Sequence, residues 1–170
     1  MVWAIIILLL AGADQLIKYF VEARISYGDS ITVIPSFFYL INRRNTGAAW
    51  SFLADQHWGI YFLASVSAIV TLVLVYIIYR TPYFKLKAVL TILVAGSVGN
   101  LIDRIFRGYV TDYLDFHFGS YAFPTFNLAD MLIVCSTAVL CTLLFADHRI
   151  IDHPFGHNKK DDEVSTNETI

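Results

Sequence analysis

The sequence predicts an integral membrane protein that is mainly α-helical, with four transmembrane helices, a small extracytoplasmic β-sheet cradle and a short interfacial helix. Two observations lead to this fold class. Hydrophobic residues make up 57% of the 170 residues, and the mean hydropathy is +0.61, whereas roughly 45–50% is usual in soluble domains. The apolar residues also form long runs, and four of these approach the roughly 20 residues that cross a bilayer.

The first predicted span covers about residues 2–21. Its apolar run is not a signal peptide, because no Lys or Arg precedes it, and Asp14 and Lys18 stand where a cleavage site would be expected. Asp14 and Lys18 are four residues apart and therefore share a helix face. We interpret them as an ion pair at the helix end that reaches up to the membrane interface. The alternative is that the pair orders a neighbouring functional site.

Residues 22–58 contain too many charged side chains for a membrane span. The β-rich runs at 31–34 and 37–41 flank a Pro-Ser pair and predict two paired strands. An Asn-Thr-Gly turn follows. Beyond the turn, apolar residues at helical spacing, together with Trp50 and Trp58, predict the short interfacial helix with aromatic anchors.

The second predicted span, 59–79, is almost free of charge. The third, 86–104, is rich in small residues near Ala95, which let helices approach closely in lipid. The fourth, 127–147, carries Asp130 in its first turn. In the segment between the last two spans, 109–111 and 116–123 are predicted to be two short extended pieces.

The four spans and their loops form one predicted domain, residues 1–150. The polar tail that follows, residues 151–170, is predicted to be disordered and cytoplasmic. Four spans place both termini on the same side of the membrane. The short basic loop 80–87 assigns that side to the cytoplasm by the positive-inside rule. The loops 22–58 and 105–126 are then extracytoplasmic, and the polar ends of the spans gather at the outer face.

Composition also excludes some classes of function and of site. The net charge of −2, with no basic stripe, argues against nucleic-acid binding. The two cysteines, Cys135 and Cys141, lie in one apolar run and point to different helix faces. We therefore predict two small apolar core residues and neither a disulfide nor a metal pair.

Polar side chains converge where the outer ends of the first, third and fourth spans meet the β-rich loop. A carboxylate at the bilayer centre costs about 2.5–3.5 kcal/mol on insertion scales, so such groups need a partner, water or a function. Two acids from separate segments, Asp112 and Asp130, are the main candidates for chemistry. Two carboxyls that face each other share a proton, so that one acts as a base and the other as an acid.

Three other uses of these acids compete with an aspartyl pair that hydrolyses a peptide bond. A carboxylate site would suit Mg²⁺ or Ca²⁺, but His117 is the only histidine near the acids and the dense spacing of a calcium loop is missing. A small transporter or channel subunit would bind a cation here, although the second span offers few polar groups to a pathway. A structural assembly factor leaves the cost of burying Asp112 and Asp130 unexplained.

Five motifs carry a resemblance to a known family. They are Asp14-Gln-Leu-Ile-Lys18, Arg44-Asn-Thr-Gly-Ala-Ala, Gly99-Asn-Leu-Ile-Asp-Arg104, Tyr109-Val-Thr-Asp112 and Phe123-Pro-Thr-Phe-Asn-Leu-Ala-Asp130. In this order, from Asp14 to Asp130, they resemble the motif set of the bacterial lipoprotein signal peptidases (signal peptidase II). Each motif alone is weakly specific, and the five together on four spans are highly specific.

The resemblance implies a membrane aspartyl endopeptidase in the bacterial cell membrane. We expect it to act as a monomer in contact with membrane lipid and without a cofactor or metal. Its substrates would be diacylglyceryl-modified prolipoproteins, cleaved just before the lipid-modified cysteine. The family's catalytic pair falls on Asp112 and Asp130. Its supporting residues fall on Asp14, Lys18, Asn45, Gly47, Gly96, Asn100, Asp103, Arg104, Asn127 and Ala129.

Two positions depart from the family pattern, and neither belongs to a reacting group. Thr111 precedes Asp112 where the family often has Val, and Ala95 precedes Gly96 where many members have Gly. Asp115, three residues past Asp112, is a competing candidate for the catalytic role. The predicted interfacial helix is also a candidate lid over the lipid-modified substrate.

Overall fold

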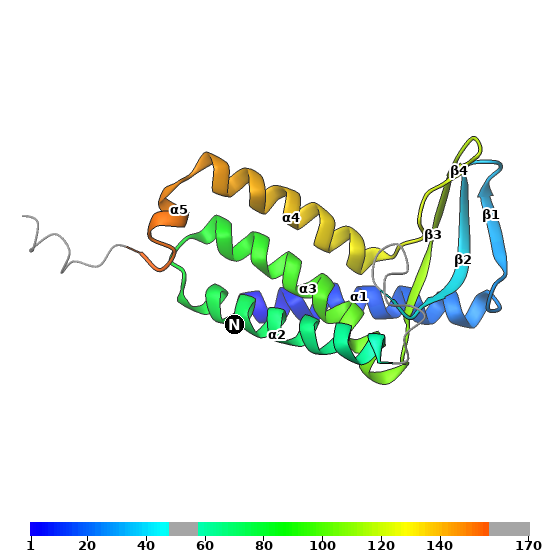
Figure 1. Cartoon of the computed structure of the whole chain (residues 1–170), viewed down its shortest axis with the longest axis horizontal. Helices are drawn as coiled ribbons and strands as arrows, with labels where there is room; N and C mark the ends of the chain where they lie inside the picture. The colour runs from blue at the N-terminus through cyan, green and yellow to red at the C-terminus, as the bar shows by residue number, and fades with distance from the viewer. Residues whose placement is uncertain (48–57, 157–170) are drawn as a thin grey trace, which may run out of the picture.

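Four long apolar helices and a small antiparallel sheet make up the computed structural model, which describes residues 1–47 and 58–156. All four helices are long and apolar enough to cross a membrane. The sheet lies across one end of the helical bundle (Figure 1). The helices are α1 (Val2–Arg24), α2 (Gly59–Arg80), α3 (Phe84–Phe106) and α4 (Leu128–Ala146). The predicted class, a mainly helical multi-pass membrane protein with a small sheet, is confirmed.

The sheet joins both polar loops of the chain. Its strands are β1 (Ser30–Ile34), β2 (Phe38–Asn45), β3 (Val110–Phe118) and β4 (Tyr121–Ala122). They are antiparallel and lie in the order β1-β2-β3-β4. The strand pair predicted in the first loop is present, and β3 from the second loop pairs with it.

The second loop differs from its prediction. Residues 110 and 111 do not form a separate piece but are the first two residues of β3, and 116–123 form a hairpin instead of one extended piece. The chain reverses after Phe118 because Gly119 takes a positive φ of 64°, a conformation that side chains with a Cβ rarely adopt. Strand β3 therefore pairs with β2 along one edge and with β4 along the other.

Helix α3 is the most buried of the four helices and contacts the other three. At the end remote from the sheet it packs an apolar cluster. The buried members of this cluster are Ile78, Leu86, Leu90, Val94 and Ile150. Ile150 lies in a short helix, α5 (Arg149–Asp152), so helical structure crosses the boundary at residue 151 where we predicted the tail to begin. Residues 157–170, and 48–57 of the predicted interfacial helix, lie outside the described residues.

The two cysteines occupy positions that differ from the prediction. Both are free, as predicted, but Cys135 and Cys141 are exposed rather than buried in the core. The reason is that α4 buries only a narrow face, which includes Ser136, against the bundle. The rest of its surface, including both thiols, faces the surroundings of the bundle.

Candidate active site

The first turn of α4 fixes the position of Asp130. The Asn127 side chain accepts a hydrogen bond from the Asp130 backbone N–H at 2.9 Å, and Asp130 Oδ2 accepts one from the Asn127 N–H at 3.1 Å. This reciprocal capping box satisfies backbone donors that every helix N-terminus leaves free. The other carboxylate oxygen, Oδ1, accepts a hydrogen bond from Asn100 Nδ2 at 2.7 Å. Asp130 is therefore held from both α3 and α4.

Asp112 reaches the same place from β3. Its Oδ1 accepts a hydrogen bond from Asn127 Nδ2 at 2.7 Å, and its Oδ2 accepts one from Asn45 Nδ2 at 3.0 Å. The side chain is buried, and burial, followed by the charge of Asp130, raises the pKa of Asp112 to about 7, although both amides favour its charged form. Asn127 thus contacts both acids, and Asp112 binds a proton at neutral pH far more readily than an ordinary aspartate.

Lys18 anchors the site from α1. Its Nζ lies 2.8 Å from Asp14 Oδ2, 2.7 Å from Asp103 Oδ2 and 3.0 Å from Asn100 Oδ1. Lys18, Asp14 and Asp103 have no exposed surface. The prediction that the Asp14–Lys18 pair reaches up to the interface was therefore wrong, because α3 packs against this face of α1 and supplies a second carboxylate. The structure favours the alternative, in which the pair orders the neighbourhood of the site.

Asn100 connects this ion cluster to the acids. Its Oδ1 accepts hydrogen bonds from Lys18 Nζ and, at 3.3 Å, from Asn127 Nδ2, while its Nδ2 donates to Asp130. Because both ends of the amide are engaged, its orientation is fixed. One continuous set of polar contacts therefore runs from the buried lysine to both acids, and the final contact to Asp112 passes through Asn127.

Close helix packing completes the site, and two glycines permit it. Asp14 Oδ1 accepts a hydrogen bond from the backbone N–H of Ala129 at 3.0 Å, which ties α1 to α4. A Cβ on Gly96 would lie 2.5 Å from the carbonyl oxygen of Ala129, and one on Gly99 would lie 2.7 Å from Asp14 Oδ2. Gly96 and Ala129 therefore serve the site by bringing α3 and α4 together.

Arg104 lies at the rim of this polar set and joins it to Gly47. Its Nη2 donates to the carbonyl oxygen of Gly47 at 3.3 Å, and its Nη1 donates to that of Asn100 at 3.4 Å. Its Nε is buried and has no hydrogen-bond partner among the residues that the structure describes. The guanidinium thus retains donor capacity for a ligand that enters beside the acids.

Asp115 does not join the two acids. It lies three residues along β3 from Asp112, and successive side chains of a strand point to opposite faces. It pairs instead with His117 Nε2 at 2.9 Å. Within residues 1–47 and 58–156, no group of three or more His, Cys, Asp or Glu side chains could hold a metal ion.

Four residues contact the site although the sequence did not predict that they would. Gln15 Nε2 donates to Asp103 Oδ1 at 3.0 Å, and Arg107 forms an ion pair with the same oxygen. Arg107 is four residues from Asp103 on a helix, a spacing that signals such a pair. The Thr111 hydroxyl donates to Glu22 Oε1 at 2.5 Å. Tyr113 presents its hydroxyl oxygen to the backbone N–H of Leu128 at 3.1 Å, and burial raises its pKa to about 12.

Comparisons with known proteins match almost the whole chain. The family model described as Signal peptidase (SPase) II matches residues 6–146. A lipoprotein signal peptidase from Serratia marcescens is 36% identical over 155 residues, which are 91% of this chain and 88% of that protein. One from Francisella tularensis subsp. novicida is 36% identical over 140 residues, 80% of this chain and 86% of that protein. A bacterial membrane enzyme structure determined by the in meso method at 2.3 Å resolution superposes with a TM-score of 0.76 at 31% identity, covering 86% of this chain and 89% of that one.

Proposed function

The chain belongs to the signal peptidase II family, and from this premise we propose that it cleaves diacylglyceryl-modified prolipoproteins with Asp112 and Asp130 as its catalytic pair. The family is one of peptidases that remove signal peptides from lipoproteins, and the chain is a multi-pass membrane protein of that family. Beyond family membership, we propose the catalytic pair, cleavage just before the lipid-modified cysteine, and a substrate that carries a diacylglyceryl group.

One observation carries the catalytic assignment. Two carboxyls from distant segments, β3 and α4, contact the same residue, since Asn127 donates its side-chain amide to Asp112 and its backbone N–H to Asp130. Both acids lie at the end of the bundle next to the sheet. A cation pathway would instead distribute polar groups along the spans, so this placement supports a peptidase over a transporter.

The mechanism needs one proton on the pair. The ionised carboxyl takes a proton from a water molecule, whose oxygen attacks the scissile carbonyl carbon, while the protonated carboxyl donates its proton to the carbonyl oxygen. The tetrahedral intermediate then breaks its C–N bond as a proton passes to the leaving nitrogen. No covalent enzyme intermediate forms. The raised pKa of Asp112, about 7, supports a pair that retains one proton at neutral pH.

The neighbouring polar groups have separate roles in this proposal. Asn45, Asn100 and Asn127 orient the carboxyls. Arg104, whose Nε has no hydrogen-bond partner within residues 1–47 and 58–156, binds a backbone carbonyl of the substrate next to the Gly47 carbonyl. The buried set around Lys18, including Asp14 and Asp103, holds α1 and α3 in register behind the acids. The candidate lid, residues 45–58, falls for the most part (48–57) outside the described residues and stays a prediction.

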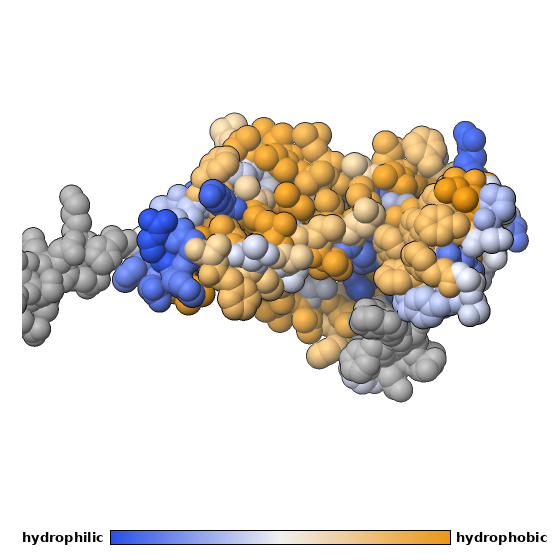
Figure 2. All heavy atoms as spheres, turned by 90° about the horizontal axis from the view of Figure 1, so that it is seen from above, coloured by the Kyte–Doolittle hydropathy of each residue, from blue (hydrophilic) through white to orange (hydrophobic). Residues whose placement is uncertain are grey.

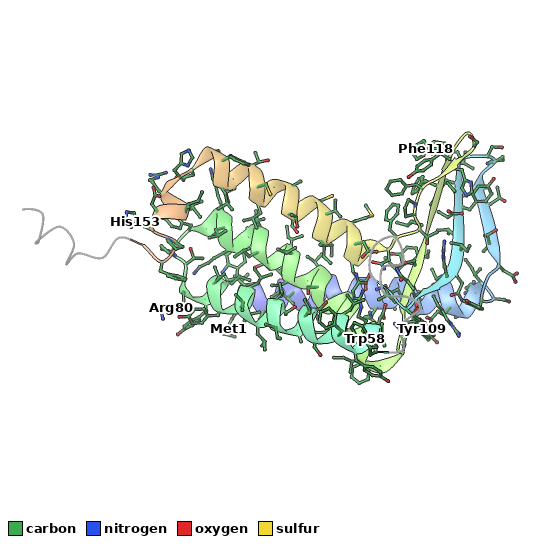
Figure 3. All side chains as sticks on the ribbon, viewed as in Figure 1. Met1, Trp58, Arg80, Tyr109, Phe118 and His153 are labelled. Atoms are coloured by element: carbon green, nitrogen blue, oxygen red, sulfur yellow. The ribbon has the colours of Figure 1, made fainter. Side chains whose placement is uncertain are left out.

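We also propose an orientation and a setting. The α2–α3 loop lies at the end of the bundle remote from the sheet, together with Met1 and His153, and is flanked by Arg80 at the end of α2 and Lys85 in the first turn of α3 (Figure 3). The positive-inside rule then places that end in the cytoplasm and the site at the outer face of a bacterial cell membrane. The enzyme acts there as a monomer, in contact with membrane lipid and without a cofactor.

The test compares the wild type with Asp112→Asn, Asp130→Asn and Asp115→Asn, reconstituted in lipid with a diacylglyceryl-modified prolipoprotein and followed by gel shift. Asn is nearly isosteric with Asp but neither ionises nor acts as the acid. We expect the first two variants to lose about 10²–10⁴-fold in rate, the range of general acid–base catalysis. Asp115→Asn serves as the matched control and retains activity.

Two outcomes would contradict the proposal. If Asp115→Asn is inactive while Asp112→Asn cleaves, the assignment is displaced by three residues. If the folded wild type never cleaves, the peptidase chemistry is wrong, and cation flux into liposomes becomes the next assay. Equal elution on size exclusion establishes that all four proteins are folded.

A further inference from the structure

The first turn of α4 is held by three side chains from different parts of the fold. A helix offers no internal partner to its first backbone N–H groups, which here belong to Leu128, Ala129 and Asp130. The N–H of Asp130 donates to the cap, and that of Ala129 donates to Asp14 of α1. The N–H of Leu128 donates to the hydroxyl oxygen of Tyr113 at 3.1 Å. Tyr113 therefore supplies a contact by which β3 holds the start of α4.

This contact joins the immediate surroundings of the two proposed catalytic acids. Tyr113 directly follows Asp112 on β3, and Leu128 lies two residues before Asp130 on α4. The backbone N–H of Tyr113 also donates to the carbonyl oxygen of Phe126 at 3.1 Å, just before the helix begins. The hydroxyl extends this attachment of the strand into the helix itself.

The ring of Tyr113 is fixed, which gives its hydroxyl a defined position. Tyr113 is 4% exposed and forms one buried cluster with Val21 and Ile25 near the end of α1. Burial, with a smaller effect of the nearby acids, raises its pKa to about 12, so the phenol keeps its proton at neutral pH. The neutral hydroxyl accepts the N–H of Leu128 without adding a negative charge beside the acids.

The two acids belong to different parts of the molecule, the sheet and the bundle. Figure 2 shows hydrophilic residues between the apolar surface of the helices and that of the sheet. The start of α4 adjoins β3 at this junction (Figure 1). Because Asp112 moves with the sheet and Asp130 with the bundle, a shift of one part relative to the other changes the separation of the two carboxyls.

We propose that the hydroxyl of Tyr113 sets the separation of the Asp112 and Asp130 carboxyls by holding the first turn of α4 against β3, an inference that rests on the proposed catalytic pair. Tyr113 acts through the backbone of Leu128 and is a positioning residue, not a catalytic one. The separation matters to the chemistry because, after burial, the charge of Asp130 is the largest cause of the raised pKa of Asp112.

The first measurement tests the contact itself in the full-length protein in detergent. Tyr113→Phe removes the hydroxyl and leaves the ring in place. We expect deuterium exchange at the Leu128 amide to become about tenfold faster, as the loss of one hydrogen bond allows. Tyr39→Phe is the matched control, because the Tyr39 hydroxyl on the neighbouring strand also accepts a backbone N–H, that of Ser36, at 3.0 Å. This control should leave Leu128 unchanged.

The second measurement tests the separation of the acids and needs no substrate. The infrared band of the protonated Asp112 carboxyl, identified by its loss in Asp112→Asn, is titrated with pH. The charge of Asp130 raises the pKa of Asp112 more than the hydrogen bond from Asn127 lowers it. Tyr113→Phe, which lets the acids separate, should therefore lower that pKa below its value of about 7.

Leu128→Pro removes the same hydrogen bond from its donor side. Leu128 is the first residue of α4, a position where proline is well tolerated, and Asn127 before it already has the extended backbone that proline requires. We expect the pKa of Asp112 to fall as in Tyr113→Phe, and the double variant to show no larger shift than either single one. This variant also provides the test if Tyr113→Phe does not fold.

The cleavage assay then shows whether the separation matters to the rate. We expect Tyr113→Phe to lower kcat about tenfold with KM unchanged, and the alkaline limb of the profile of kcat against pH to move to lower pH. Tyr39→Phe should keep the wild-type profile.

Several results would overturn the proposal. Unchanged exchange at Leu128 in Tyr113→Phe would show that the hydroxyl does not hold α4. Faster exchange with an unchanged or raised pKa of Asp112 would show that this contact does not set the separation. Equal changes in Tyr39→Phe would indicate a general loss of stability. If the wild type does not cleave, the proposed function fails, while exchange and titration still decide whether Tyr113 positions the two carboxyls.

Discussion

The two ends of the helical bundle are equally buried but held by different forces. At the sheet end, Lys18 is fully buried and contacts two carboxylates. At the other end, Leu90 and Val94 are 3% and 1% exposed, and their neighbours are apolar. Apolar packing stabilises a fold without the desolvation cost of ions, which often equals or exceeds the gain from pairing them. The ion cluster is therefore better explained by the geometry it imposes on Asn100 and the acids than by stability.

The largest effect should separate geometry from stability. Lys18→Met keeps the volume but removes the cation that Asp14 and Asp103 share, which should destabilise the fold by about 3–5 kcal/mol. It also frees Asn100, and a displacement of about 1 Å costs about 10²-fold in rate. Leu90→Ala at the opposite end should lose about 2–5 kcal/mol.

The measurement is thermal unfolding in detergent beside the cleavage rate per folded enzyme. We expect Leu90→Ala to retain the wild-type rate below its unfolding temperature and Lys18→Met to lose it. If the two variants lose rate in proportion to stability, the ion cluster is only another part of the core.

A second pair of variants tests close packing between α3 and α4. A Cβ at position 96 would lie 2.5 Å from the Ala129 carbonyl oxygen and 2.9 Å from Ile133 Cγ1, so Gly96→Ala must push α4 away. We expect a loss of about 1–3 kcal/mol and a rate reduced about tenfold, since Asp130 follows Ala129 directly. Gly12→Ala is the matched control, because nothing lies within 4 Å of its Cβ. An active, stable Gly96→Ala would show that the helix spacing is not critical.

Thr111 offers a smaller and more local test behind the acids. Its hydroxyl donates to Glu22 Oε1 at 2.5 Å and its backbone N–H donates to Asp103 Oδ2 at 3.4 Å, so both contacts steady the strand next to Asp112. Thr111→Val removes this donor, but Glu22 is 27% exposed and keeps Arg107 Nε at 3.8 Å, so the cost is that of one ordinary hydrogen bond, about 0.5–1.5 kcal/mol. We expect a several-fold lower kcat, an unchanged KM and full rescue by Thr111→Ser. An altered KM with unchanged kcat would instead place Thr111 in substrate binding.

The contrast between the two ends also explains what the sequence reveals. The four spans and the strand pair are local features, set by hydropathy runs and by β-rich runs, and both are present. The burial of Lys18 depends on a carboxylate supplied by α3, and the exposure of Cys135 depends on how little of α4 is covered. Such properties belong to pairs of elements distant in sequence, and no local pattern contains them.

The site shows the same division. The motifs drew attention to Asp112, Asp130 and the amides before their geometry was known, because each is a polar group at a costly position. The bridging role of Asn127 and the contact between Thr111 and Glu22 follow only from the pairing of distant strands and helices. Arg107 is the exception, since its position four residues after Asp103 is enough to predict an ion pair between them on one helix.

The smallest expected effect is a shift of pH dependence. Asn45 donates to Asp112 Oδ2 at 3.0 Å and stabilises the charged carboxylate, which lowers the pKa of Asp112 against the larger opposing effect of burial. Asn45→Ala should therefore raise that pKa above its value of about 7. A hydrogen bond to a charged group is worth about 1.5–3 kcal/mol, so the pKa is expected to rise by about one to two units.

The rate should change in a defined direction. The wild type loses activity as pH rises through about 7, because the pair then gives up the proton that its acid must donate. In Asn45→Ala this loss of activity, the alkaline limb of the profile of kcat against pH, moves to higher pH. Asn42→Ala is the matched control, since buried Asn42 on the same strand donates to the Ile25 carbonyl at 2.8 Å and not to Asp112. A limb that moves to lower pH, or that moves equally in both variants, would show that Asn45 does not tune the pair.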